Sequence, residues 1–298
     1  MPPIKYLITG ATGGLGKEVL RYFSENVPST DFAAASSKPE SKSIFEDRGI
    51  AFRHVNYNDA ESLETGLANV ENLLFVSSAG ATRMEQHSRL IAAAKKAGVK
   101  HIWYTSLAFG GLSNNSTSPV QVDHVHTEQL LKESGLVYTS IREGVYAEAF
   151  PVFLDWKPDS TKVLLPADGE IASTSRPELG EATARIMIRG GYKNQIVLFT
   201  AQETINAKEI VDVINETTDR QVDFEIVSPD EYITSSLQDS QGNLREYFES
   251  VVERCDDIVN GSLSTVDLLM AEILGREPTK PRESIRQLLA KNRDYTYP

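Results

Sequence analysis

The sequence predicts an α/β fold, and three of its features carry this prediction. The chain begins with an apolar run, residues 4–9, that breaks into glycines and continues with a helical pattern over residues 15–23. Further apolar runs follow up to residue 142, separated by segments of helical periodicity. From residue 151 prolines and glycines punctuate shorter elements. This pattern is typical of a Rossmann-type, doubly wound parallel sheet with a smaller C-terminal lobe that covers the substrate.

The turn after the first strand has the spacing G-x-x-G-x-x-G, at Gly10, Gly13 and Gly16. We expect Gly10 to permit the turn, Gly13 to let a ligand approach the backbone, and Gly16 to let the helix pack on the strand. A diphosphate can then bind at the helix N-terminus, where free N–H groups and the positive end of the helix dipole point outward. The turn therefore predicts a dinucleotide site formed by Gly10, Thr12, Gly13, Gly14, Leu15 and Gly16.

The end of the second strand, residues 31–36, bears on which dinucleotide is bound. NAD-binding folds of this type place a carboxylate about 20 residues after the glycines. Here the strand ends in Ser36, Ser37 and Lys38, with no carboxylate. We therefore expect NADPH, with these residues near its 2′-phosphate; if Lys38 is only a solvated loop lysine, NADH remains possible.

The other elements of the first 150 residues follow in order. Strands are expected at 51–55, 72–78, 101–106 and 136–142, and helices at 41–47, 59–67, 83–97 and 122–133, with Asp59 as a helix N-cap. The expected strand order is 3-2-1-4-5-6, which gathers the carboxyl ends of the strands at one edge. There the cofactor is expected to meet Asn58, Asp59, Ser77, Ser78, Thr105 and Gly144.

Residues 151–298 are expected to form a mixed, mostly helical lobe. An apolar strand at 196–199 is expected to return to the sheet, and a helix at 206–217 and a short strand at 222–227 precede further helices up to residue 290. We therefore divide the chain into a dinucleotide-binding domain, 1–150, and a substrate lobe, 151–298. A glycine-rich loop at 110–116 lies where a lid would sit.

Composition and net charge indicate which classes of partner and which cellular compartment to expect. Acidic residues number 42 against 30 Lys and Arg, which gives a net charge of −12. Such a surface repels nucleic acid and anionic membranes, so an anionic cofactor needs a local positive patch. We expect no cleaved leader, and no membrane span because no apolar stretch approaches ~18 residues. The one cysteine, Cys255, fits a reducing compartment, so we expect a cytoplasmic protein. We expect it to be a monomer or a homodimer.

With these segments assembled, the sequence resembles the NmrA-like family of atypical short-chain dehydrogenases, and within it the type 2 quinone oxidoreductases. The resemblance rests on the motif at 8–16, on residues 93–100, 104–107, 124–128 and 138–148, and more weakly on 169–173 and 275–278. Two departures affect function. The family's arginine after the second strand is Ser37 here, and its Asn-Gly-Trp-Tyr segment reads Glu143-Gly144-Val145-Tyr146. The resemblance implies an NADPH site. The first departure weakens the selectivity for NADPH over NADH, and the second allows a different substrate.

The resemblance also directs attention to three candidate catalytic residues. Typical short-chain dehydrogenases use Tyr-x-x-x-Lys, in which the lysine lowers the pKa of the tyrosine. The corresponding helix here carries His124 and Glu128 on one face, so the tyrosine acid is missing. A quinone tolerates this loss because its ring stabilises the hydroquinone anion. We expect His124 to donate a proton or a hydrogen bond, Ser106 to hold the place of the catalytic serine, and Tyr146 to stack on a planar substrate.

The same residues have structural interpretations. His124 could simply bond Glu128, and Ser106 could be a strand-end hydroxyl bonded to backbone. No metal site is expected, because His124 and His126 point about 200° apart on a helix.

Three functions stay open. The leading one is an NADPH-dependent oxidoreductase that transfers a hydride to a quinone or a similar conjugated carbonyl. The second is a non-catalytic redox sensor of the NmrA type, which the loss of Tyr-x-x-x-Lys would permit. The third is a tailoring reductase or isomerase acting on an aromatic, polyketide-like molecule, which Glu143 and Val145 would allow.

Overall fold

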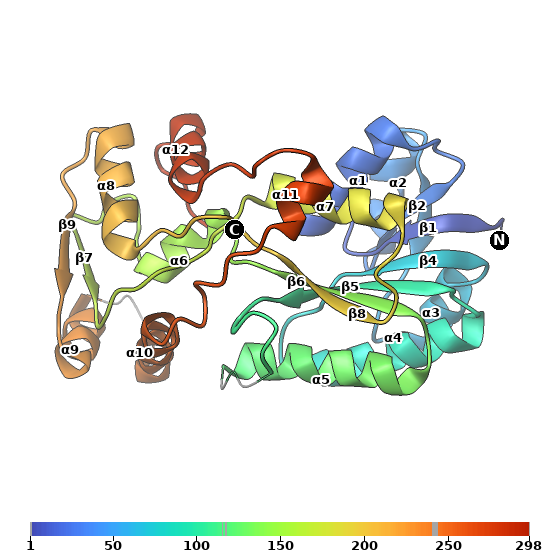
Figure 1. Ribbon diagram of the computed structural model, residues 1–298, viewed down its shortest axis with the longest axis horizontal. Coiled ribbons are helices and arrows are strands. Elements are labelled where there is room, and N and C mark those ends of the chain that lie inside the picture. The colour runs from blue at the N-terminus through green and yellow to red at the C-terminus, as the bar shows by residue number, and fades with distance from the viewer. Residues whose placement is uncertain (1, 115, 117, 240–243, 298) are drawn as a thin grey trace.

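A computed structural model describes residues 2–114, 116, 118–239 and 244–297. Within these residues seven strands form one sheet in the order β3-β2-β1-β4-β5-β6-β8, and every neighbouring pair is parallel (Figure 1). The strands are β1 (Ile4–Ile8), β2 (Phe32–Ser36), β3 (Ala51–His54), β4 (Val70–Phe75), β5 (His101–Leu107), β6 (Tyr138–Glu143) and β8 (Gln195–Phe199). The expected order 3-2-1-4-5-6 is confirmed, and β8 is the expected returning strand.

Burial explains why β1 and β4 lie in the middle of the sheet. Leu7 and Ile8 point to opposite faces of β1 and are both fully buried, and the same holds for Leu73 and Leu74 of β4. A strand that is apolar on both sides needs a layer of helices above and below it. The doubly wound arrangement follows.

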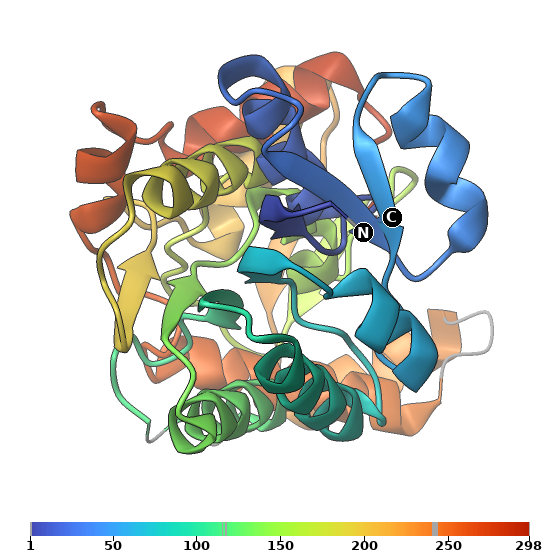
Figure 2. The same cartoon turned by 90° about the vertical axis from the view of Figure 1, so that its right-hand side faces the viewer.

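Helices supply those two layers (Figure 2). One face is covered by α1 (Gly14–Asn26), α7 (Arg176–Arg189) and α11 (Leu269–Leu274), which share a core with Ile8 and Leu74. The other is covered by α3 (Ala60–Gly66), α4 (Arg83–Ala97) and α5 (Pro119–Ser134), which share a core with Leu7 and Leu73. The short helix α2 (Lys42–Glu46) adds Phe45 to the first core.

Several boundaries differ from expectation, and two of them lie near the predicted site. Helix α5 begins at Pro119 rather than near residue 122, because a proline fits the first turn of a helix, where its missing N–H costs nothing. Strand β4 ends at Phe75, so Ser77 and Ser78 lie in the loop after it. Asn115 of the expected lid loop, and Thr117 just after it, lie outside the described residues.

The lobe lies at the left of Figure 1. It contains a second parallel sheet of β7 (Lys162–Leu165) and β9 (Asp223–Ile226), with α6 (Phe150–Leu154), α8 (Ala207–Thr218), α9 (Pro229–Asp239), α10 (Arg245–Val259) and α12 (Pro281–Lys291). Its own core includes Phe150, Trp156 and Phe248. Helices α7 and α11 pack on the main sheet together with β8. Three elements from beyond residue 150 therefore belong to the main sheet and its helix layer, where one strand was expected. No helix in the described part of the chain is long and apolar enough to cross a membrane.

Candidate functional site

The glycine turn is built so that side chains are excluded from it. Gly10 has a φ of +62°, and a Cβ there would lie 3.0 Å from Cβ of Val76. A Cβ on Gly16 would overlap the carbonyl of Gly10, so α1 can pack this closely only with glycine. Gly13 precedes α1 as its N-cap without a side-chain cap, and Gly14 is exposed. The first N–H groups of α1 are therefore open to a ligand.

The end of β2 lies beside this turn. The hydroxyl of buried Ser36 lies 3.5 Å from that of Thr12 and accepts a hydrogen bond from the backbone N–H of Lys38 at 3.2 Å. The ring Nε2 of His54 lies 3.2 Å from the carbonyl of Ser37. Ser36 thus orders the bend, and the side chains of Ser37 and Lys38 are exposed.

The loop after β3 caps α3. The carboxylate of Asp59 accepts hydrogen bonds from the backbone N–H groups of Glu61 and Ser62, which confirms it as an N-cap. Asn58 is exposed, and its side chain accepts from Arg89 at 3.3 Å. Sequence reasoning missed Tyr57, whose hydroxyl lies 3.0 Å from the carbonyl of Val76 and ties this loop to the end of β4.

Two serines follow β4 and are held by their backbones. The N–H of Ser77 donates to the hydroxyl of Thr105 on β5 at 3.0 Å. The N–H of Ser78 donates to Nε2 of His87 at 3.1 Å, so this buried ring is neutral with its proton on Nδ1, 2.8 Å from Thr127 Oγ1. Burial and the nearby Arg83 lower the pKa of His87 to about 3. The hydroxyl of Ser78 is buried with no hydrogen bond within the described residues.

His124 is buried on α5, and its ring has a different partner from the one considered. Its Nδ1 lies 2.8 Å from the hydroxyl of Tyr104 on β5, and the Glu128 carboxylate is engaged elsewhere. Burial, with the positive charge of Arg83 second, lowers the pKa of His124 to about 3. The ring is therefore neutral at physiological pH. A neutral ring can donate a hydrogen bond, and the role of His124 toward a substrate stays a prediction.

Ser106 belongs to a buried charged network. Its hydroxyl donates to Glu128 at 2.8 Å, and Ser140 donates to the same oxygen at 2.7 Å. Arg142 pairs with both oxygens of Glu128, and its remaining N–H groups bond loop oxygens, those of Gly111, Ser113 and Asn114. The Ser106 hydroxyl is thus engaged by a carboxylate, and the network fastens the start of the expected lid loop to the sheet.

The segment that departs from the family pattern forms its own pair. The hydroxyl of Tyr146 donates to Oε2 of Glu143 at 2.9 Å, while Oε1 is buried with no hydrogen bond within the described residues. Burial raises the pKa of Glu143 to about 8. Gly144 follows, and a Cβ there would lie 2.8 Å from the carbonyl of Ala172. At neutral pH this end of β6 presents a neutral carboxylic acid.

Arg176, the first residue of α7, was missed because nothing in its local sequence marks it. Its Nη1 lies so close to Gly14 that a Cβ on the glycine would overlap it. Its guanidinium is also 5.9 Å from the ring of Tyr146 and 5.5 Å from that of Tyr297, and its Nε is 3.6 Å from the carboxylate of Glu148. Arg176 therefore supplies a positive charge at the glycine turn.

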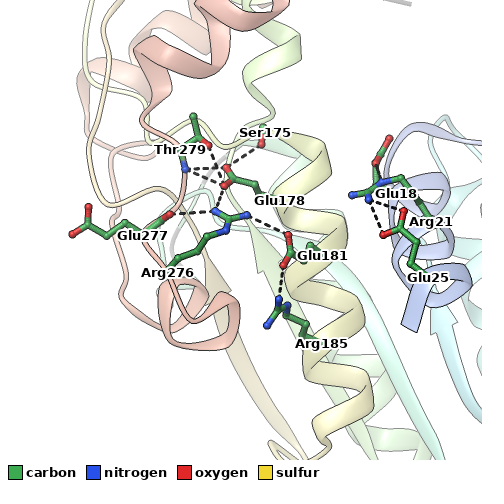
Figure 3. A network of polar contacts seen from close by, with 10 residues as sticks. All are labelled: Glu18, Arg21, Glu25, Ser175, Glu178, Glu181, Arg185, Arg276, Glu277 and Thr279. Carbon is green, nitrogen blue, oxygen red and sulfur yellow. Dashed lines mark hydrogen bonds and ion pairs between the residues drawn. The ribbon is translucent and has the colours of Figure 1, made fainter. Parts of the chain in front are cut away.

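The N-terminal turn of α7 is fixed by a polar network (Figure 3). Glu178, buried to 6% exposure, accepts from Arg276, from the N–H of Thr279 at 3.0 Å and from Ser175 at 3.1 Å. Arg276 also reaches Glu181 at 3.2 Å. The conformation of residues 275–279 is thereby coupled to the position of α7.

The predicted residues do gather along one edge of the sheet. The glycine turn contacts Val76, Thr12 lies beside Ser36, and Ser77 bonds Thr105. Gly144 lies directly after β6 at the same edge. Their roles toward a ligand stay predictions.

A sequence model described as the NmrA-like family matches residues 4–280. The chain belongs to the NmrA-like family. It is 54% identical over 300 residues to the NmrA-like family domain-containing oxidoreductase flvB of Aspergillus flavus, covering 99% of this chain and 98% of that protein. It is 28% identical to Quinone oxidoreductase 2 of Escherichia coli, covering 96% of this chain and 99% of that protein.

Two solved structures superpose on this chain along nearly its whole length. The NADPH complex of the E. coli quinone oxidoreductase superposes on this NmrA-like chain with a TM-score of 0.83 at 27% identity, covering 95% of this chain and 99% of the other. The NADP(H) complex of Citrobacter sp. triphenylmethane reductase has a TM-score of 0.82 at 28% identity, with the same coverage.

Proposed function

We propose that this protein is an NADPH-dependent oxidoreductase that reduces a quinone or a similar conjugated carbonyl. The observation that carries the proposal is the N-terminus of α1 at the carboxyl edge of the sheet, where glycines at 10, 13, 14 and 16 contribute no side chains of their own and only the guanidinium of Arg176 is described against Gly14. The hydroxyl of Ser78, in the loop after β4 at that edge, is buried with no hydrogen bond within the described residues. The complexes of the two similar reductases with NADPH and NADP(H) support the choice of cofactor.

The residues of the cofactor site divide by position. The glycine turn with Thr12 and Leu15 would hold the diphosphate. Ser36, Ser37 and Lys38 would meet the 2′-phosphate, and Asn58 and Asp59 would border the adenine. Ser77, Ser78, Thr105 and Gly144 would lie along the nicotinamide half. When bound, NADPH supplies the hydride from C4 of its nicotinamide.

The chain's own contribution is orientation more than acid catalysis. His124 is neutral and can donate a hydrogen bond to a carbonyl oxygen. Tyr146, which donates a hydrogen bond to Glu143, would stack on a planar ring, and Glu143 is itself largely uncharged at neutral pH. Ser106 acts as a positioning residue through Glu128 unless substrate displaces that bond. A quinone suits such a site because the hydroquinone anion can take its protons from water.

Two alternatives have specific support. A non-catalytic redox sensor is favoured by the state of two candidate catalytic residues, since His124 is neutral and Ser106 is bonded to Glu128. A tailoring reductase or isomerase is favoured by the Glu143 and Val145 departure, and the 54% identical relative carries only the general name oxidoreductase.

Turnover with a substrate panel separates these functions. We would follow the loss of NADPH and, separately, NADH absorbance with small quinones, conjugated ketones and triphenylmethane dyes, using Gly13→Val as the control that blocks the diphosphate. Quinone-dependent oxidation that this variant lacks would support the reductase. Tight NADPH binding by calorimetry without oxidation of any compound would support the sensor or a specialised substrate instead.

A further inference from the structure

Arg176 lies where α7 meets α1. The two helices run side by side on one face of the sheet (Figures 1 and 2), and the guanidinium of Arg176 lies against Gly14, the first residue of α1. Its side chain is 17% exposed. A cation is thus held, largely buried, at the N-terminus of a helix of 13 residues.

This placement is electrostatically unfavourable for a protein without an anion there. The N-terminus of a helix carries the positive end of the dipole, so a guanidinium beside it is repelled. Glu148 compensates in part, at 3.6 Å from Nε, and the rings of Tyr146 and Tyr297 offer weaker cation–π attraction. An anion between the guanidinium and the α1 N–H groups would remove the repulsion.

We propose that Arg176 binds the diphosphate of the dinucleotide, opposite the glycine turn. The inference rests on the proposed function and adds to it the local positive patch that a chain of net charge −12 requires. A planar guanidinium can contact two phosphate oxygens through a fixed pair of N–H groups, a bidentate geometry that the ammonium group of lysine does not have. Arg176 thereby binds the side of the diphosphate that the α1 N–H groups do not reach.

The backbone under Arg176 is rigid, so the side chain alone adjusts to the ligand. The N–H of Arg176 donates to the Glu148 carboxylate at 3.1 Å. Two residues later Glu178 anchors the same turn to Thr279 and Arg276 (Figure 3). A fixed anchor lowers the entropy cost of ordering a long side chain on a ligand.

Calorimetric titration tests the proposal with two probes. NADPH carries the diphosphate; adenosine 2′-monophosphate carries the adenosine and the 2′-phosphate but no diphosphate. Arg176→Met keeps the side-chain stem and removes the charge, so NADPH affinity is expected to fall by about 10- to 100-fold while that of adenosine 2′-monophosphate stays within about twofold. Arg176→Lys is expected to be intermediate. Arg185→Ala on the same helix, where Arg185 pairs with Glu181, is the matched control and should bind both probes as wild type does.

The outcomes separate this proposal from the proposed function. Wild-type NADPH affinity in Arg176→Met would overturn the role of Arg176 and leave the cofactor assignment intact, and an equal loss for both probes would overturn a diphosphate contact in favour of general damage. Failure of the wild-type protein to bind NADPH would overturn both. Near-UV circular dichroism checks the fold; should Arg176→Met not fold, the Arg176→Lys affinities decide by the same criteria.

Discussion

Glu143 shows how a single residue can alter a shared site. Where the resembled group has asparagine, this chain has a carboxyl group that is 1% exposed, and one of its oxygens has no hydrogen bond within the described residues. Burial raises its pKa to about 8, and the bond from Tyr146 only partly offsets that shift. The residue therefore resembles an amide in charge at neutral pH, yet becomes an anion in alkaline solution.

This carboxyl group predicts a pH-dependent stability. Its pKa is raised from 4.5 to about 8, so the folded protein retains a proton that the unfolded chain loses between those values. Its contribution to the free energy of unfolding is therefore present below pH 4.5 and lost as the pH rises toward 8. Glu143→Gln removes this pH dependence. The free energy of unfolding of the variant, relative to that of wild type, should therefore be higher at pH 8 than at pH 5 by on the order of 3 kcal/mol. Urea unfolding at both pH values measures this, and a difference that stays constant would contradict the raised pKa.

His124 predicts a kinetic effect without a titration. As a neutral hydrogen-bond donor it should contribute about tenfold to turnover, so His124→Ala should lower kcat with NADPH affinity unchanged. The pH profiles of the wild-type and His124→Ala rates should not differ by a titration near pH 6.5, because the pKa of His124 is about 3. His126→Ala, an exposed neighbour on α5, is the control. Steady-state kinetics that leave His124→Ala at wild-type turnover would make His124 a structural residue.

At the scale of elements, α5 is joined to the sheet by charge as well as by apolar packing. Glu128 and Arg142 are 4% and 0% exposed, so water does not solvate their charges, and the two side chains form an ion pair with each other. Arg142 also donates to the carbonyls of Gly111 and Ser113, so the same ion pair holds both α5 and the loop after β5 against the sheet.

Breaking this pair should be costly. Glu128→Gln leaves the guanidinium of Arg142 buried without a counter-charge, and the free energy of unfolding is expected to fall by about 3–5 kcal/mol. Glu133→Gln on the same helix, where exposed Gln129 donates a hydrogen bond to Glu133, should change it by less than about 0.5 kcal/mol. Urea unfolding at pH 7 compares the two. Equal stability of both variants would show that the network contributes little.

The elements that sequence could predict are those whose signals are local. The glycine spacing, the buried runs of β1 and β4 and the N-cap at Asp59 each lie within a few residues, and the structure places the strands in the expected order. The partners of Ser106, His124 and Arg176 could not be predicted, because each contact joins segments that only the completed fold brings together. Arg176 is the clearest case, since 162 positions separate it from Gly14.

On the scale of the whole molecule, the lobe and the sheet meet at the carboxyl edge. Residues beyond 150 return to the sheet as α7, β8 and α11, and α7 brings Arg176 against the glycine turn. A chain with a net charge of −12 thus presents a cation at the point where a dinucleotide would bind. The fold and the family are shared with proteins named oxidoreductases, and the departures at Ser37 and Glu143 lie in the part of the fold where the proposed cofactor and substrate would bind.

The central claim is hydride transfer from NADPH to a conjugated carbonyl. The most direct measurement is a single turnover of the wild-type protein loaded with NADPH and mixed with a simple quinone, repeated with NADPH deuterated at the transferred position of C4. We predict quinone-dependent oxidation that deuterium slows severalfold, because breaking that C–H bond is the chemical step. Bound NADPH that no quinone oxidises would contradict the account.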